Sequence, residues 1–446
     1  MTAKPPAERP AEDASTAGPA APTQGGLSRR GLLGLAGTGA IAAGAGFAAG
    51  HFTAPGSSAT ATTPAAAAPY PFHGTHQAGI VTPAQDRLHF AAFDISSSSR
   101  DDLVTLLKTW TDAAARMTQG QPAGEYGPAA GPYDSPPDDT GEAFGLPASG
   151  LTITFGFGPS LFADAKGKSR FGLGDRRPAA LVELPHFRGD ALAPQRSDGD
   201  LCVQACADDP QVAVHAIRNL SRIAFGTAPL RWSQLGFGRT SSTSTSQATP
   251  RNLFGFKDGT ANLKAEQPEL VEDFVWVQDS DDPAAAWLHG GSYLVARRIN
   301  MTIEIWDRQA LREQERVIGR TKGDGAPLSG GTEFTEPDFK LMGAADQPLI
   351  DVDSHVRIAH RTQNKGIQIL RRGYNFADGN DDLGRLDAGL FFISYLRNPV
   401  TQYVPLQSRI SRLDAMQEYV QHTGSGLFAV PPGAAPGEFV GQRLFD

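Results

Sequence analysis

The sequence predicts an α+β fold made of two similar halves, and three observations support this prediction. Apolar runs with strand character alternate with amphipathic runs of helical period. Their order in the first half is strand, helix, strand, strand, helix, strand, which is the ferredoxin-like split βαβ unit, and a second set of strands and helices follows. The 446-residue chain is 40% hydrophobic and 20% charged, which is typical of a globular protein with a substantial core.

The first half is predicted to span residues 70–240. Its first helix begins after two serines and two acids, which are typical of a helix start, and carries apolar residues at helical spacing from Leu103 onward. Its second helix begins at Asp209 and Pro210, because an acid caps a helix well and proline is tolerated in the first turn. The four strands are expected at residues 88–95, 151–155, 200–207 and 230–237.

The second half is predicted to span residues 241–446, and a Ser/Thr-rich segment at 241–250 joins it to the first. A Gly/Pro/Asp-rich loop is expected at residues 122–148 of the first half. In the second half the periodicity predicts strands at residues 273–278, 292–306 and 387–396, and helices at 307–319 and about 400–419.

Residues 1–50 are predicted to form an export signal. Arg29 and Arg30 precede a weakly apolar, Ala/Gly-rich stretch, which is the pattern of a twin-arginine signal. Residues 51–69 are rich in Ser, Ala, Thr and Pro and are expected to form a flexible linker. A retained membrane anchor is the alternative, although the stretch is shorter than a spanning helix prefers. We therefore expect the twin-arginine translocase as a partner, and an extracellular, cell-envelope or periplasmic location.

The composition excludes several classes of protein. A net charge of −8 argues against a general nucleic-acid binder, because phosphate binding needs a basic surface. Two cysteines are too few for a disulfide-rich scaffold, a four-thiolate iron–sulfur cluster or a Cys-rich zinc module. Cys202 and Cys206 share one face of a predicted strand, about 13 Å apart, so we expect buried free thiols and no disulfide.

Asp258 is the first candidate for chemistry. The Asp258-Gly259 pair follows an aromatic run, Phe254 to Phe256. Most Asp-Gly pairs are simple turns, since glycine accepts positive φ. An acid flanked by apolar surface is also a candidate for proton transfer.

His355 is the second candidate. It lies in a strand-like apolar stretch and is followed within 17 residues by four arginines, which suggests a metal ligand beside an anion-binding patch. The acidic segment from Asp378 to Asp382 resembles a calcium loop, but it lacks the glycine and the glutamate that such a loop needs at its sixth and twelfth positions. We interpret it as a surface turn.

These segments together resemble the dye-decolorising peroxidase family, in particular its exported twin-arginine branch, whose members are also described as deferrochelatases. Gly255, Asp258 and Gly259 match the family's GxxDG motif. The resemblance covers nearly all of the chain after the export signal and linker, and it implies two ferredoxin-like halves that enclose one haem b per chain. The segments that carry it are residues 70–80, 255–260, 318–328, 353–355, 370–374 and 386–395.

The resemblance implies a role for each site residue. His355 would be the proximal ligand of the haem iron, Asp258 the distal acid and Arg371 the distal arginine. His360 is the rival proximal ligand. His360 and Arg361 stand where the family often has the segment Asn-Pro-Arg. This sequence has one residue fewer in that segment. Further haem contacts are implied for Gly259, Thr260, Ala261, Arg320, His360, Arg361 and Arg371. For the second nitrogen of the proximal histidine, Asp387 is the candidate acceptor.

The implied function is a haem peroxidase that reduces hydrogen peroxide and oxidises bulky aromatic or dye-like donors. A carboxyl group has a reference pKa of about 3.9, so a peroxidase with a carboxylate base is expected to work best at acid pH. Tyr374 and Tyr395 are candidate electron relays, although core packing is the commoner role of an aromatic residue. A deferrochelatase within an iron-uptake system, or a non-enzymatic haem or iron carrier, are the alternatives. A monomer and a homodimer are both compatible with the sequence.

Overall fold

The computed structural model describes residues 68–446, which belong to one compact unit. The predicted export signal and nearly all of the predicted linker lie outside the described residues. Within residues 68–446, no helix has both the length and the apolar character needed to cross a membrane.

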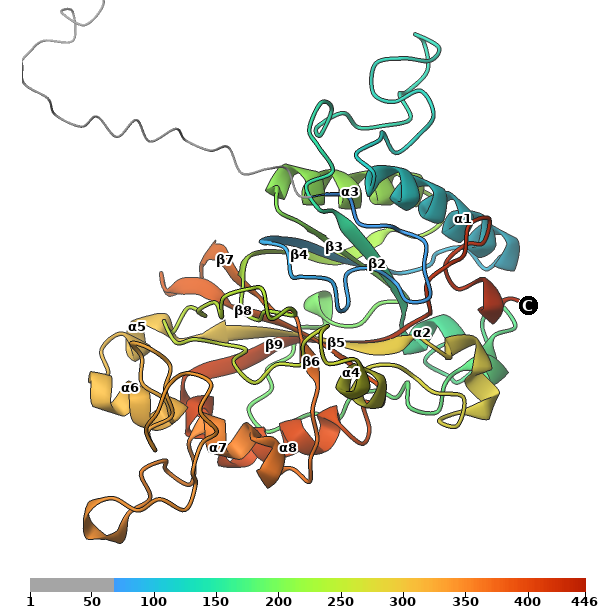
Figure 1. Cartoon of the computed structure of the whole chain (residues 1–446). Coiled ribbons are helices and arrows are strands. Elements are labelled where there is room, and N and C mark those ends of the chain that lie inside the picture. The colour runs from blue at the N-terminus through green and yellow to red at the C-terminus, as the bar shows by residue number, and fades with distance from the viewer. Residues whose placement is uncertain (1–67) are drawn as a thin grey trace, which may run out of the picture. The chain divides into compact units, whose positions relative to one another are not determined.

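The strands of the two halves form a single antiparallel sheet (Figure 1). Its order is β5-β9-β2-β3-β1-β4-β7-β8-β6, and β5 also pairs with β8, so that eight of the strands close into a ring. The α+β class with antiparallel pairing is confirmed, but the halves do not keep separate sheets. The strands are β1 Arg87–Phe93, β2 Thr152–Phe157, β3 Leu201–Ala207, β4 Leu230–Arg239, β5 Ser292–Met301, β6 Leu370–Arg371, β7 Tyr374–Asn380, β8 Leu386–Leu396 and β9 Val420–Val430.

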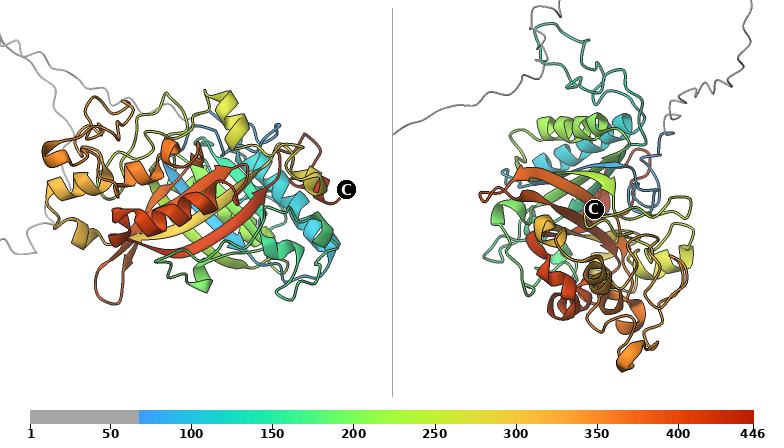
Figure 2. Two further views of the ribbon diagram at one scale, coloured as in Figure 1. Left: turned by 90° about the horizontal axis from the view of Figure 1, so that it is seen from below. Right: turned by 90° about the vertical axis from the view of Figure 1, so that its left-hand side faces the viewer.

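Helices cover the sheet on two sides (Figure 2). Helices α1, Arg100–Met117, and α3, Pro210–Ile223, pack against the first-half strands. Both begin as predicted, because Ser99 accepts a hydrogen bond from Asp102 N and Asp209 accepts one from Gln211 N. On the other side lie α6, Leu311–Ile318, α7, His355–Ala359, and α8, Tyr403–Leu413. The shorter helices are α2 Pro159–Phe162, α4 Pro268–Phe274 and α5 Ile303–Trp306.

Several second-half elements differ from their predictions. The predicted strand at residues 273–278 is wrong: Pro268 opens helix α4, which runs into that region. The predicted strand at 292–306 ends at Met301 and is followed by α5, and the next helix starts at Leu311. The helix predicted over about 400–419 ends at Leu413, because Asp414 is extended. Strands β6, β7 and β9 were not predicted.

Cys202 and Cys206 are buried free thiols, as expected. They pair in register with Ala92 and Leu88 of β1, and all four residues belong to the core enclosed by the closed sheet.

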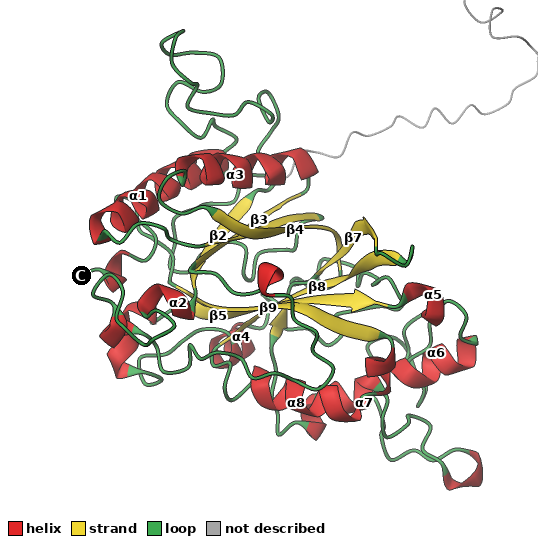
Figure 3. Cartoon of the chain, turned by 180° about the vertical axis from the view of Figure 1, so that it is seen from behind, coloured by secondary structure: helices red, strands yellow, loops and turns green. Residues whose placement is uncertain are grey.

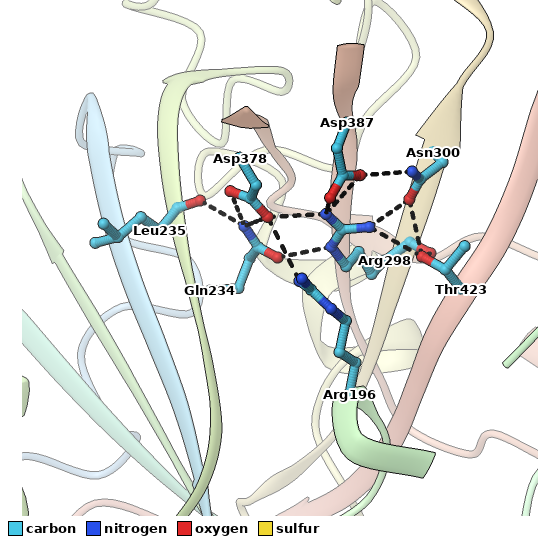
Figure 4. A network of polar contacts seen from close by, with 8 residues as sticks. All are labelled: Arg196, Gln234, Leu235, Arg298, Asn300, Asp378, Asp387 and Thr423. Carbon is cyan, nitrogen blue, oxygen red and sulfur yellow. Dashed lines mark hydrogen bonds and ion pairs between the residues drawn. The ribbon is translucent and has the colours of Figure 1, made fainter. Parts of the chain in front are cut away.

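A polar network around a buried arginine joins the halves (Figure 4). At its centre, the Arg298 guanidinium donates to Asp378 at 2.8 Å and to Asp387 at 2.8 Å, while Nε donates to Gln234 Oε1 at 3.0 Å. Gln234 lies on β4, whereas the arginine and both acids lie on the second-half strands β5, β7 and β8. The acidic segment that was expected to be a surface turn therefore begins with an acid that holds a buried arginine.

Candidate active site

Asp258 and Arg371 form an ion pair in a partly open site. Arg371 Nη1 donates to Asp258 Oδ1 at 2.8 Å, and their side chains are 27% and 14% exposed. Asn252 Nδ2 donates to the other carboxylate oxygen at 3.2 Å. Both oxygens of the acid are therefore oriented by donors, while the pair stays accessible to a small molecule.

A tight turn presents the Asp258 side chain. The Asp258 N–H donates to the carbonyl of Pro250 at 2.9 Å. Gly259 adopts φ +86°, and a Cβ at this position would lie 2.9 Å from the Cα of Ser241. The turn therefore requires glycine both for its dihedral angle and for the close approach of residue 241. The turn interpretation and the proton-transfer interpretation of this Asp-Gly pair are compatible.

Arg371 is fixed through its backbone by Asn262. The Arg371 N–H donates to Asn262 Oδ1 at 2.7 Å, and Asn262 Nδ2 donates back to the Arg371 carbonyl at 2.8 Å. The next residue, Arg372, is fully buried and donates instead to Gln85 and to the carbonyl of Thr82. Consecutive arginines thus serve different parts of the molecule, and only the first reaches Asp258.

His355 is the first residue of helix α7, which corrects the strand-like interpretation of this stretch. Its Nδ1 lies 2.6 Å from Asp414 Oδ2, and the side chain of Asp414 is completely buried. The predicted partner Asp387 is wrong, because that carboxylate is bound by Arg298 and Asn300. No partner contacts the Nε2 of His355 within the described part of the chain, which leaves this atom available as a ligand.

Three charged side chains shift the pKa of His355. Burial lowers the pKa of His355, but the Asp414 carboxylate outweighs burial and raises it above the ordinary value. The charge of Asp258 raises this pKa further, and the charge of Arg371 lowers it. The groups whose charges act on the His355 imidazole are therefore Asp414, Asp258 and Arg371.

His360 is the weaker candidate ligand. Its Nδ1 lies 2.9 Å from Thr362 Oγ1 and its Nε2 lies 3.3 Å from Glu336, so both ring nitrogens contact polar partners. Burial lowers its pKa, against the opposing charge of Glu336. Arg361 also pairs with Glu336, at 3.1 Å. The ring that has a nitrogen without such a partner is His355.

Arg320 is a buried cation without a carboxylate partner in the described residues. It is 8% exposed and donates to the carbonyls of Gly325 at 2.7 Å and Glu333 at 2.8 Å. Burial lowers its pKa, although Glu333 and Glu336 oppose the effect. A buried charge needs compensation, and a haem propionate carries the required charge.

The residues present fit a haem. One histidine can complete the coordination of an iron that a porphyrin already holds, and proximal histidine is a common haem ligand. His355 supplies a free nitrogen, while Arg320 supplies a cation for a carboxylate edge. Thr260 donates to Glu333 at 3.2 Å, and Ala261 is exposed. The haem contacts of Gly259, Thr260 and Ala261 remain predictions.

Both halves match known families. The N-terminal Dyp-type peroxidase family model matches residues 77–238, and the C-terminal one matches residues 249–435. A dye-decolorizing peroxidase of Thermobifida fusca is 36% identical, covering 94% of this chain and 98% of the relative. A deferrochelatase of Escherichia coli K12 is 37% identical, covering 81% and 84%.

Solved structures agree. Ferric DtpA from Streptomyces lividans is 42% identical with a TM-score of 0.76, over 85% of this chain and 97% of that chain. A DyP-type peroxidase from Cellulomonas bogoriensis is 39% identical with a TM-score of 0.73, over 84% and 98%. The fold and the site thus define a haem-dependent peroxidase. The chain belongs to the Dyp-type peroxidase family.

Sequence reasoning missed four residues that shape the site. Three of them are polar residues whose partners are distant in the chain, so no local motif reveals their roles. The fourth, Asn252, lies only six positions from its partner Asp258. Asp414 had one available signal, because an acid that interrupts a predicted helix is a candidate cap. The four residues are Asn252, Asn262, Glu333 and Asp414.

Proposed function

We propose that the chain holds one haem b between His355 and the Asp258–Arg371 pair, and that these residues carry the peroxidase reaction. The observation that carries the proposal is the pairing on each side: Asp258 with Arg371 at 2.8 Å, and His355 with Asp414 at 2.6 Å. When bound, the haem supplies the iron centre that reduces hydrogen peroxide and then takes electrons from the organic donor.

Asp258 acts as the proton shuttle. Reduction of hydrogen peroxide requires a proton to move from one oxygen to the other, so that water can leave. The Asp258 carboxylate takes this proton and returns it to the departing oxygen. Arg371 supplies a fixed positive charge that stabilises the negative charge developing on the peroxide. Because the base is a carboxylate, we expect dye oxidation to be fastest at acid pH.

Asp414 orients and polarises the proximal histidine. Its buried carboxylate accepts a hydrogen bond from the Nδ1–H of His355, which leaves Nε2 as the nitrogen that would bind the iron and makes it a stronger ligand. Arg320 and Arg361 are proposed to hold the carboxylate edge of the haem, since cations match carboxylates in charge and hydrogen bonding. His360 is proposed to contact the haem beside them.

The peroxidase assay of haem-loaded protein tests these roles. Asp258→Ala and Arg371→Ala are expected to lose turnover with hydrogen peroxide and a dye by about a hundredfold or more, because positioned proton transfer contributes this much. Both variants are expected to keep a haem absorption band. Full turnover in both variants would favour a non-enzymatic haem or iron carrier.

A deferrochelatase activity is the second candidate, favoured by the Escherichia coli relative that carries this name. Incubation of the protein with haem, with and without peroxide, distinguishes the two functions. Metal-free porphyrin fluorescence is expected only if iron is released with the ring intact. Such an activity would make components of an iron-uptake system plausible partners.

We also propose export by the twin-arginine translocase to an extracellular, cell-envelope or periplasmic location. The support is the Arg29-Arg30 pair before an Ala/Gly-rich stretch. Replacing both arginines with lysine is expected to retain the protein in the cytoplasm, as measured by cell fractionation. Light scattering of the purified protein distinguishes a monomer from a homodimer.

A further inference from the structure

We propose that Glu333 is a positioning residue for Asp258, with a carboxylate that holds both sides of the turn presenting the acid. This inference rests on the proposed role of Asp258 in proton transfer. Glu333 lies in the long segment between helices α6 and α7, which consists mostly of loops and turns (Figure 3). Nothing in the local sequence around Glu333 connects it with the distal acid.

The Glu333 carboxylate contacts the residues on both sides of the Asp258-Gly259 turn. Lys257 Nζ donates to one carboxylate oxygen, and Thr260 Oγ1 donates to the other at 3.2 Å. The side chain of Glu333 is 10% exposed and that of Lys257 is 25% exposed, so solvent screens the pair only weakly. Because residues 257 and 260 are both held, the turn between them has little freedom to move.

The backbone of Glu333 extends the link to Arg320. Arg320 Nη1 donates to the Glu333 carbonyl at 2.8 Å and to the Gly325 carbonyl at 2.7 Å. At Gly325, a Cβ would lie 2.9 Å from Cδ of Lys257, so glycine allows the segment to approach the lysine closely. One residue therefore connects the turn of the distal acid with the arginine proposed to bind a haem carboxylate.

The charge of Glu333 balances the cations around the turn. Burial raises the pKa of Glu333, but Lys257 and the hydroxyl groups of two threonines outweigh burial and hold the pKa below its ordinary value. Its negative charge also acts on Lys264, whose pKa falls to about 8 through burial and the charge of Arg371. Loss of Glu333 would leave the buried part of Lys257 without its carboxylate partner.

Cyanide binding to haem-loaded ferric protein tests the proposal without turnover. Hydrogen cyanide gives up a proton when it binds, so its affinity, read from the absorption spectrum, depends on a well-placed distal base. In Glu333→Ala, we expect cyanide affinity and kcat/KM for peroxide to fall about tenfold, because small displacements of a catalytic group have effects of this size or larger. Glu333→Gln keeps the side-chain length and an acceptor for Thr260, so it is expected to recover part of the loss.

Two further variants separate positioning from stability. Asp200→Asn removes another buried carboxylate, which pairs with Arg170 at 2.8 Å in the first half. It is expected to lower the melting temperature but to keep cyanide affinity within about twofold of wild type, since the sites are independent. If Glu333→Ala does not fold, Lys257→Gln provides the test, and it is expected to weaken cyanide binding as well.

These experiments distinguish an error in the proposed role of Glu333 from an error in the proposed peroxidase function. Wild-type cyanide affinity in Glu333→Ala and Lys257→Gln, with reduced stability alone, would overturn the positioning role and leave the peroxidase proposal intact. Wild-type protein that neither binds haem nor reduces peroxide would overturn the proposed function itself.

Discussion

The partner of His355 decides how the proximal side of the site works. Asp414 is buried at the end of helix α8, and its carboxylate also caps the following turn by accepting from Met416 N. The Asp414 carboxylate is therefore held in place by a contact other than the one with the imidazole. A carboxylate held in this way keeps the histidine in one tautomer and one orientation.

Asp414→Asn is expected to weaken haem binding by about 10- to 100-fold, the usual effect of removing a partner of a metal ligand. Transfer of haem to apomyoglobin measures the change. Asp387→Asn is the matched control. The sequence analysis expected Asp387 to accept a hydrogen bond from the proximal histidine, but Asp387 binds Arg298 instead. Equal losses in both variants, or a loss only in Asp387→Asn, would contradict the assignment of Asp414.

The site residues themselves were predictable, but their partners were not. Asp258, His355 and Arg371 lie in motifs that resemble those of the peroxidase family. The structure brings the acid and the arginine into contact. Asn262 and Asp414 contact residues 109 and 59 positions away in the chain. Such pairs depend on the tertiary fold, which local sequence patterns do not specify.

At the scale of elements, the Asp258-Gly259 turn depends on glycine for two reasons. Gly259 has φ +86°, which is unfavourable for other residues, and the space for a Cβ is taken by Ser241. Replacing Gly259 with any other residue would therefore strain the backbone directly beside Asp258.

Gly259→Ala is expected to destabilise the protein by about 1–3 kcal/mol and to reduce peroxide turnover. Gly167→Ala is the control, because Gly167 has φ +77° but has open space where a Cβ would be added. It is expected to have only the backbone effect, about 1 kcal/mol, and normal turnover. Chemical unfolding and a peroxidase assay measure both, and equal behaviour of the two variants would argue against the role of the close contact.

The mispredicted elements differ from their predictions for two physical reasons. Strand β9 contains Gly424 and Gly426, which weaken a strand signal, yet both lie in a ladder with β5. The prediction of a helix through residue 414 was based on the spacing of apolar residues. It overlooked Asp414, the acid at which the helix ends. Tertiary pairing outweighs local preference in β9. The end of α8 is instead determined locally, by the extended Asp414.

At the scale of the whole molecule, two consecutive arginines of β5 bind acids on opposite faces of the sheet. Arg297 pairs with buried Asp190, which belongs to the first half, and Arg298 pairs with Asp378 and Asp387. The closed ring of strands could not be predicted, because its closure depends on backbone pairing between distant strands. The residue bounds of the two halves remain predictions.

His422, on β9 beside Arg297, makes stability depend on pH. Burial and the charge of Arg297 lower its pKa to about 3, below the ordinary value of 6.5. The unfolded chain therefore binds more protons, so stability is fully present above pH 6.5 and falls as the pH drops toward 3.

His422→Gln is expected to flatten the pH dependence of the unfolding free energy between pH 6.5 and 4, as measured by urea unfolding. His186→Gln is the control, because His186 is exposed, and it is expected to behave like wild type. An unchanged slope in His422→Gln would show that other groups determine the acid sensitivity.

The proposed function depends most on which histidine binds the haem iron. The measurement is electron paramagnetic resonance of haem-loaded ferric wild type, His355→Gln and His360→Gln. We predict that the nitrogen-ligand signature is lost in His355→Gln and kept in His360→Gln. Of these two histidines, His355 is the one with a ring nitrogen that has no polar partner among the described residues and with a buried carboxylate on the other nitrogen. Loss of the signature in His360→Gln with retention in His355→Gln would contradict the assignment.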